Sequence, residues 1–422
     1  MSEFFSVFAG WLIDGTGAKI QRNVILKIKD GFVVAIEILP HGKDYSTGAL
    51  DFSHCTLLPG LVDCHVHLFM SGTADKKLRE KQLMYGFEEV RGIISQHIQE
   101  HLSHGVVALR DGGDYASLTL RYKKEWLPHE KHPVSLKSAG RAWRAKGRYG
   151  RLIGRPPHSG YTLAQSIALC DEKTDHVKIV NSGLNSLRHF AKETPPQFSL
   201  DELAAAVHTG GHLGLKTMVH ANGHLPVRLA VRAGCHSVEH GFFMGRENLE
   251  EMARRQVFWV PTAYTMRGYA EQLDRGSHEA DIAQSNLEHQ LNQLLWARRL
   301  GLPVALGTDC GSLGVHHGKA FHEELRLLMQ AGFSLQEAVR CATINGAHLL
   351  SLENEIGQVK EGMPATFVVV RGEPSSLPES LSSPEATYVR GKRVLCDLNI
   401  LCYTITPSPC ENRSNGHLSR KQ

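Results

Sequence analysis

Gly60-Leu-Val-Asp-Cys-His-Val-His-Leu68 is the stretch on which the fold and the chemistry of this chain depend. It is an apolar, β-type run that ends in two histidines, His65 and His67. Because side chains two positions apart on a strand project to the same face, both imidazoles leave the strand together. Neutral imidazole is the commonest metal ligand in proteins, so the pair can grip one ion. The chain has 25 histidines, so this pair alone decides nothing.

The composition is that of an ordinary globular protein. Of 422 residues, 42% are hydrophobic and 21% charged, and the net charge of +4 is too small to indicate a nucleic-acid partner. Nine scattered cysteines without a CxxC pair favour a reduced, cytoplasmic protein. The apolar start carries no basic leader, and no run reaches the roughly 18 apolar residues of a membrane span. We therefore expect a small-molecule substrate, neither a signal peptide nor a membrane partner, and no more than a possible homo-oligomer.

The periodicity of the chain changes twice. Residues 1–58 contain short strand-like runs at 4–8, 24–28 and 32–38, and residues 356–402 add further runs at 356–359, 365–370, 386–389 and 393–395. These two parts are expected to form one small discontinuous β-sandwich domain. Residues 403–422 lack periodicity and are expected to form a flexible tail.

Residues 59–355 alternate between strands and helices. Eight apolar runs suit buried parallel strands, at 61–65, 106–110, 134–138, 177–180, 217–220, 237–240, 257–261 and 304–307. Capping boxes at Ser199–Glu202 and Ser334–Glu337 open helices between or after them. Eight strand–helix units are the count of a (β/α)8 TIM barrel, so the predicted fold class is α/β.

Functional groups of such a barrel lie at the carboxyl ends of its strands. Metal-ligand types occupy five of these ends: His65, His67, Lys178, His220, His240 and Asp309. Chance alone would seldom place four His, one Asp and one Lys at the ends of the predicted strands. Histidines in loops or helical segments are instead expected at the surface: His41, His101, His104, His208 and His212.

As a set, these motifs resemble the metal-dependent amidohydrolase superfamily. The resemblance rests on Pro59-Gly-Leu-Val-Asp-Cys-His-Val-His67, His-Val-Lys-Ile, Met-Val-His-Ala, Val-Glu-His-Gly and Gly-Thr-Asp, and it covers about residues 10 to 395. The branch that looks most similar is imidazolonepropionase-like and prolidase-like, and it includes the Xaa-Arg and Xaa-Lys dipeptidases.

The resemblance implies a role for each ligand. His65, His67 and Asp309 would hold the more buried of two divalent ions, most simply Zn²⁺, and His220 and His240 the other. Lys178 would carry a carbamate that bridges both ions. Burial lowers the pKa of a lysine, so its neutral amine can capture carbon dioxide. Asp309 would also be the catalytic residue, taking a proton from water and giving it to the leaving amine.

Substrate contacts are expected in the loops that follow the strands. From Lys137 to Arg155 there are seven Lys or Arg residues and no acid, which suits an anionic substrate. An arginine there can pair with a carboxylate in a bidentate fork. The candidate contacts are Arg141, Arg144, Arg148, Tyr149, Tyr264, His316 and His317.

Three functions stay open at this point. The first is a binuclear metal-dependent hydrolase of an amide bond in a dipeptide or N-acyl amino acid that carries a carboxylate. The second is a cyclic amide hydrolase or a deaminase of a heterocycle, although the strand-four Lys178 argues against the one-metal deaminases. The third is a non-enzymatic scaffold, which is disfavoured because no ligand is lost.

Overall fold

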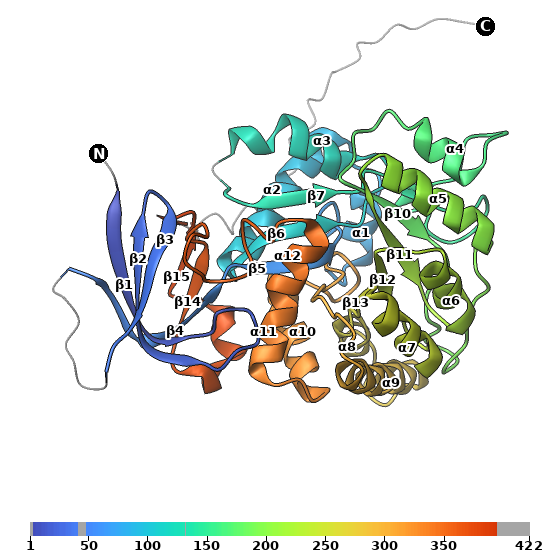
Figure 1. Ribbon diagram of the computed structural model, residues 1–422. Helices are drawn as coiled ribbons and strands as arrows, with labels where there is room; N and C mark the ends of the chain where they lie inside the picture. Colours follow the sequence, from blue (N-terminus) through green and yellow to red (C-terminus); the bar gives the residue numbers. More distant parts are fainter. Residues whose placement is uncertain (1–2, 41–47, 131, 395–422) are drawn as a thin grey trace, which may run out of the picture.

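The computed structural model describes residues 3–40, 48–130 and 132–394. The predicted tail, the last residues of the predicted β-domain and His41 lie outside the described residues. Figure 1 shows a sheet built from both ends of the chain beside a larger body of parallel strands and helices. No described helix is long and apolar enough to cross a membrane.

The first sheet joins the two ends of the chain. Its order is β16-β15-β14-β4-β1-β2-β3, and β14 pairs antiparallel with β4. The buried faces of these strands form a separate apolar core that includes Val7, Leu26 and Phe367. The strands are β1 Phe4–Leu12, β2 Gln21–Lys29, β3 Phe32–Ile38, β4 Leu50–Pro59, β14 Phe367–Arg371, β15 Ala386–Val389 and β16 Lys392–Arg393.

One predicted strand of this region is wrong. Residues 356–358 form a bend and 359 is irregular, because Gly357 has a φ of +99°, a left-handed value that an extended strand does not use. The other described strands form one seven-stranded sheet. The two-layer sandwich and the domain boundaries after residues 58 and 355 stay predictions.

The larger body is α/β, as predicted, with two parallel sheets. One has the order β5-β6-β7 and the other β13-β12-β11-β10-β8-β9. Seven of the eight predicted strands recur within one or two residues, whereas β8 and β9 lie in the basic segment where no strand was expected. The strands are β5 Leu61–Val66, β6 Val106–Asp111, β7 Ser135–Ser138, β8 Ala142–Trp143, β9 Gly154–Arg155, β10 His176–Val180, β11 Lys216–Ala221, β12 Ser237–His240 and β13 Phe258–Val260.

Helices follow most of these strands (Figure 1). Both predicted capping boxes are present, with the Ser199 and Ser334 hydroxyls accepting from the backbone N–H groups of Glu202 and Glu337. The helices are α1 Lys76–Gln82, α2 Phe87–Ser103, α3 Leu118–Glu125, α4 Leu163–Ala168, α5 Leu200–His212, α6 His224–Arg232, α7 Arg246–Arg255, α8 Tyr264–Glu271, α9 His278–Arg299, α10 Lys319–Gln330, α11 Leu335–Ala342 and α12 Ile344–Leu350.

Residues 303–310 link the two parallel sheets. Val304 bridges to Trp259 of β13, and Cys310 bridges to Val66 of β5. Within the predicted strand at 304–307 only Val304 forms a bridge, so this prediction of a regular strand is wrong. Gly307 is necessary here, since a Cβ would lie 2.4 Å from a Val260 methyl and 3.0 Å from the His65 Cβ. The link places Asp309 beside the end of β5, while closure into an eight-stranded barrel stays a prediction.

Candidate metal centre

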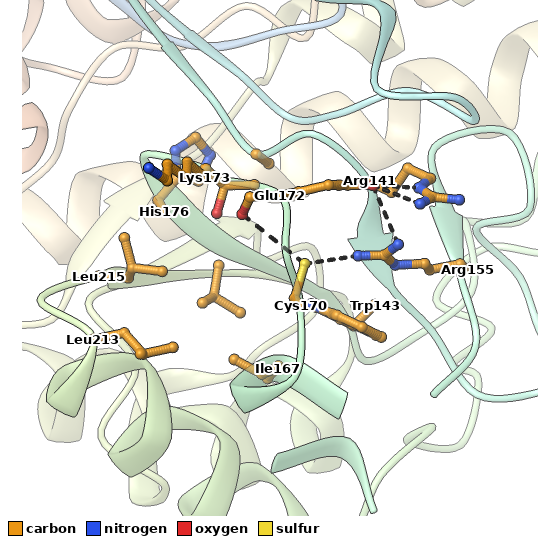
Figure 2. Close-up of a pocket in the computed structure, with 13 residues that line it drawn as sticks. Arg141, Trp143, Arg155, Ile167, Cys170, Glu172, Lys173, His176, Leu213 and Leu215 are labelled. Carbon is orange, nitrogen blue, oxygen red and sulfur yellow. Dashed lines mark hydrogen bonds and ion pairs between the residues drawn. The ribbon is translucent and has the colours of Figure 1, made fainter. Parts of the chain in front are cut away.

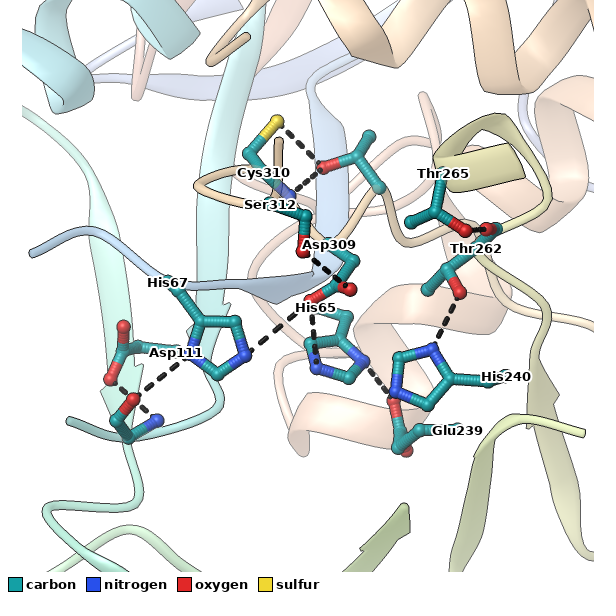
Figure 3. A network of polar contacts seen from close by, with 12 residues as sticks. His65, His67, Asp111, Glu239, His240, Thr262, Thr265, Asp309, Cys310 and Ser312 are labelled. Atoms are coloured by element: carbon teal, nitrogen blue, oxygen red, sulfur yellow. Dashed lines mark hydrogen bonds and ion pairs between the residues drawn. The ribbon is translucent and has the colours of Figure 1, made fainter. Parts of the chain in front are cut away.

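The ends of four parallel strands and the linking segment bring the predicted ligands together. Nζ of Lys178 lies 3.3 Å from Nε2 of His65. Oδ1 of Asp309 lies 3.5 Å from the same His65 nitrogen and 3.4 Å from Nε2 of His67 (Figure 3). The His240 ring centroid is 4.9 Å from that of His65 and 4.5 Å from that of His220. Six side chains from distant parts of the sequence thus meet in one place.

Each imidazole is anchored through one ring nitrogen, three of them by a hydrogen bond and His65 by an ion-pair contact. Nδ1 of His67 donates to the Gly113 carbonyl at 2.9 Å, and Nε2 of His220 contacts the Gly183 carbonyl at 3.2 Å. Nδ1 of His240 lies 2.7 Å from the Thr262 hydroxyl, and Nδ1 of His65 lies 2.9 Å from Glu239. Anchoring one nitrogen leaves the other with its lone pair, as in metal-binding histidines.

Burial keeps the imidazoles neutral in the absence of a metal and brings the pKa values of the lysine and the aspartate close to neutral pH. It lowers the pKa of His67 to about 4 and that of His220 to about 3, and the positive charge of Lys178 is the second cause of both shifts. Burial also lowers the pKa of Lys178 to about 8 and raises that of Asp309 to about 7. Neutral imidazoles and a readily deprotonated lysine are the forms that can bind a metal ion or carbon dioxide.

The buried Glu239, which comes just before His240, was not predicted as a functional residue. Its carboxylate accepts two hydrogen bonds from Nη2 of Arg110, at 2.9 and 3.0 Å, in addition to its contact with His65. The hydroxyl of Ser237 also donates to it. Arg110 at the end of β6 was the available signal, because a charge inside an apolar strand needs a buried partner.

Asp309 is held by its neighbours. The hydroxyl of Ser312 donates to Oδ2 of Asp309 at 2.9 Å, whereas Oδ1 faces His65 and His67. The backbone of Asp309 has a φ of +58° and that of His240 a φ of +67°. Such conformations are costly for residues other than glycine and are concentrated at functional sites.

Gly112 makes room for the histidine pair. A Cβ at this position would lie 2.7 Å from Cε1 of His67 and 3.2 Å from Nε2 of His65. Since real Cβ atoms do not approach so closely, any larger residue would displace the two imidazoles. This glycine lies directly after β6, where the sequence alone gave no reason to single it out.

Two predicted substrate contacts are tyrosines. The ring centroid of Tyr149 lies 5.5 Å from that of His220, so this residue borders the centre. Tyr264 is buried, and its hydroxyl lies 3.5 Å from Glu271. Whether either one contacts a substrate stays a prediction.

The predicted arginines are already bonded within the protein. Arg141 donates to Glu172, which also pairs with Arg155, and Arg144 donates to the carbonyls of Ala145, Arg148 and Gly154. Arg141 lines a cavity of about 270 Å³ whose lining includes none of the six predicted metal ligands (Figure 2). A role of Arg141 or Arg144 in binding a carboxylate stays a prediction.

His317 and His101 lie elsewhere. Both are buried, with Nε2 of His101 3.2 Å from Nδ1 of His317. The prediction that His101 is a surface residue is therefore wrong, because it lies on the buried face of α2 with Val90, Ile94 and Ile98. His208 and His212 are exposed, as predicted.

The arrangement suits a metal ion. Ligand atoms of His65, His67 and Asp309 all lie within 4.8 Å of one another. Nitrogen and carboxylate oxygen ligands are those of zinc and related divalent ions. The four anchored imidazoles, the buried lysine and the aspartate therefore fit such a centre.

Comparison with known proteins agrees with this geometry. Residues 56–394 match the amidohydrolase family. Ochratoxinase of Aspergillus niger is 24% identical over 422 residues, which cover 90% of this chain and 84% of that protein. Imidazolonepropionase of Kosmotoga olearia is 24% identical over 381 residues, which cover 83% and 85%.

Solved structures show the same fold. A Xaa-Pro dipeptidase with bound methionine superimposes with a TM-score of 0.74 at 22% identity, over 93% of this chain and 100% of that one. The structure of A. niger ochratoxinase gives a TM-score of 0.75 at 19% identity, over 93% and 96%. The resemblance predicted from the motifs is confirmed: the chain belongs to the amidohydrolase family, a generally metal-dependent group of hydrolases.

Proposed function

We propose that this chain is a binuclear, zinc-dependent hydrolase of an amide bond in a dipeptide or an N-acyl amino acid that carries a carboxylate. In this proposal the parallel strands close into a (β/α)8 barrel around the centre. The observation that carries it is the meeting of His65, His67, His220, His240, Lys178 and Asp309, with each imidazole anchored through one nitrogen.

Each ligand has a proposed place. His65, His67 and Asp309 would hold one divalent ion, and His220 and His240 the other. Lys178 would hold both through a carbamate, since its amine is fully buried, 3.3 Å from a neutral imidazole. Two such ions supply a hydroxide at neutral pH and polarise the scissile carbonyl.

In the proposed reaction, proton transfer is the task of Asp309. Asp309 would take the proton of the attacking water and return it to the leaving amine, as general base and then general acid. Ser312, bonded to Oδ2, fixes the rotation of the carboxylate. Glu239, whose carboxylate lies 2.9 Å from Nδ1 of His65, would orient the His65 ring.

The substrate class follows from two observations. A solved structure with the same fold is named a Xaa-Pro dipeptidase, which suggests an amide next to an amino acid. The basic segment 137–155, with Tyr149 beside His220, would receive the carboxylate. The second candidate is a cyclic amide hydrolase, because an imidazolonepropionase is equally similar in sequence.

The test combines metal analysis with a substrate panel. We expect about two zinc ions per chain at this centre, and turnover of Xaa-Arg, Xaa-Pro or N-acyl amino acids rather than of hydantoin-like or imidazolone compounds. The reverse preference would favour the second candidate, and a metal-free, inactive chain would favour a scaffold.

Asp309→Asn tests the assigned proton transfer. The variant should lose nearly all turnover yet stay folded, because the amide keeps the shape but not the basicity of the carboxylate. Asp171→Asn, at an exposed position, is the matched control and should keep normal turnover. Near-normal turnover of Asp309→Asn would refute the assignment.

A further inference from the structure

A second group of possible metal ligands lies away from the proposed centre. Ligand atoms of His101, Cys310 and His317 all lie within 4.8 Å of one another, and all three residues are buried. His101 comes from α2, whereas Cys310 and His317 come from the segment after the sheet link. Figure 3 shows the Cys310 side chain pointing away from the Asp309 carboxylate, so the two groups occupy opposite sides of one backbone segment.

Hydrogen bonds fix the orientation of His317. Its Nε2 donates to the Met70 carbonyl at 2.9 Å, which leaves the lone pair on Nδ1. That nitrogen lies 3.2 Å from Nε2 of His101. A backbone carbonyl behind the ring is the usual outer partner of a metal-binding histidine.

A second histidine of α2, His97, packs against this group but is not one of its three possible ligands. Its ring stacks on that of His317, with centroids 3.8 Å apart and planes 20° from parallel. Its Nδ1 donates to the Leu68 carbonyl at 2.8 Å. By contrast, the buried Nδ1 of His101 has no hydrogen-bond partner among the residues that the structure describes.

The spacing suits an ion of the zinc class. With bonds of about 2.0 Å to nitrogen and about 2.3 Å to sulfur, tetrahedral ligands lie about 3.3 to 3.6 Å apart. The two histidine nitrogens already lie near this separation. The thiol, whose sulfur lies within 4.8 Å of both nitrogens, would move closer to reach this spacing, and a water molecule would complete the four ligands.

We propose that His101, Cys310 and His317 bind a further transition-metal ion, such as Zn²⁺, in a site separate from the catalytic centre. The ion would be structural. It would tie α2 to the segment that carries Asp309, one residue before Cys310, and thereby hold the catalytic carboxylate in place. Soft thiolate with imidazole selects zinc or copper rather than calcium or magnesium.

Cobalt is the probe, because a cysteine ligand is absent from the proposed catalytic centre. The full-length chain would be produced in cobalt-supplemented medium and its absorption spectrum recorded. We expect a thiolate-to-Co²⁺ charge-transfer absorption in the near ultraviolet. Cys310→Ser should abolish it, and His101→Gln should weaken cobalt binding at this site at least tenfold.

His97→Gln is the matched control, since it changes another buried histidine of the same helix that stacks on the site without belonging to it. It should keep the absorption. A wild-type spectrum without the sulfur band, or a band that survives Cys310→Ser, would overturn the proposal. If Cys310→Ser does not fold, the wild-type band and its weakening in His101→Gln decide.

The two proposals fail in different ways. Visible cobalt absorption without a sulfur band would refute this site and leave the catalytic centre standing. A sulfur band in a chain that binds one metal ion would support this site and contradict the binuclear centre.

Discussion

Replacing Glu239 by Gln should weaken both the fold and the metal centre. The carboxylate is fully buried and accepts two hydrogen bonds from Arg110 as well as contacting His65. An amide keeps one acceptor, but its NH₂ group would face a donor of Arg110 or of His65. Because the charge of buried Arg110 then lacks a partner, we expect unfolding free energy to fall by about 3–5 kcal/mol.

The effect on the metal centre is a separate measurement. His65 would lose the contact that orients its ring, and loss of such an outer partner weakens metal affinity about 10- to 100-fold. Urea unfolding of chelator-treated protein gives the stability change, and competition with a chromophoric chelator gives the affinity.

Glu251→Gln is the matched control for this prediction. Glu251 pairs with Arg254 and Arg255 on the surface of α7, so its substitution should change stability by less than about 0.5 kcal/mol. A Glu239→Gln protein as stable as this control would refute the assigned buried pair. Lost stability with unchanged zinc affinity would refute the role of Glu239 in orienting His65.

Three further predictions concern the centre and the first sheet. Lys178→Met removes the amine that would carry the carbamate, so metal analysis should find fewer than two ions per chain at this centre and turnover should be lost. Chelation should lower the melting temperature, because free zinc at about 100 times its dissociation constant adds about 2.7 kcal/mol to the folded state. Phe367→Ala should cost about 3–5 kcal/mol in urea unfolding, since this buried ring stacks on Tyr388 at 4.7 Å, whereas Phe4→Ala, at a position 59% exposed, should change little.

The regular strands could be predicted because their sequence pattern is local. β5, β6, β10, β11 and β12 are runs of buried apolar residues, and their bounds agree with the predicted runs within one or two residues. The incorrect strand predictions concern segments whose structure depends on contacts between residues distant in sequence. Residues 304–307 form a single isolated bridge, at Val304, and β8 and β9 exist because the basic segment folds back to pair with itself and with β10.

The predicted ligands came from residue type and position on a strand, both visible in the sequence. The residues that hold these ligands in place could not be predicted, because they depend on which strands face each other across the interior. Glu239 and Arg110 are 129 residues apart, and nothing local in either strand identifies the other. The arginine pairs of the basic segment were hidden in the same way, since Glu172 lies outside the run of positive charge.

The pairing of Arg110 with Glu239 bears directly on the state of Lys178. Two buried bases, Arg110 and Lys178, and the buried acid Glu239 lie on strands of this region. Glu239 bonds to the guanidinium, and no described carboxylate lies within ion-pair distance of the Lys178 amine. An unpaired buried ammonium is costly, so the lysine is stable there as a neutral amine or as an anionic carbamate between cations. The substitution Arg110→Met removes the guanidinium that bonds to Glu239 and leaves Lys178 intact. Glu239 could then pair with the Lys178 ammonium, so the fraction of chains that carry the carbamate should fall. Mass spectrometry of the intact protein measures that fraction.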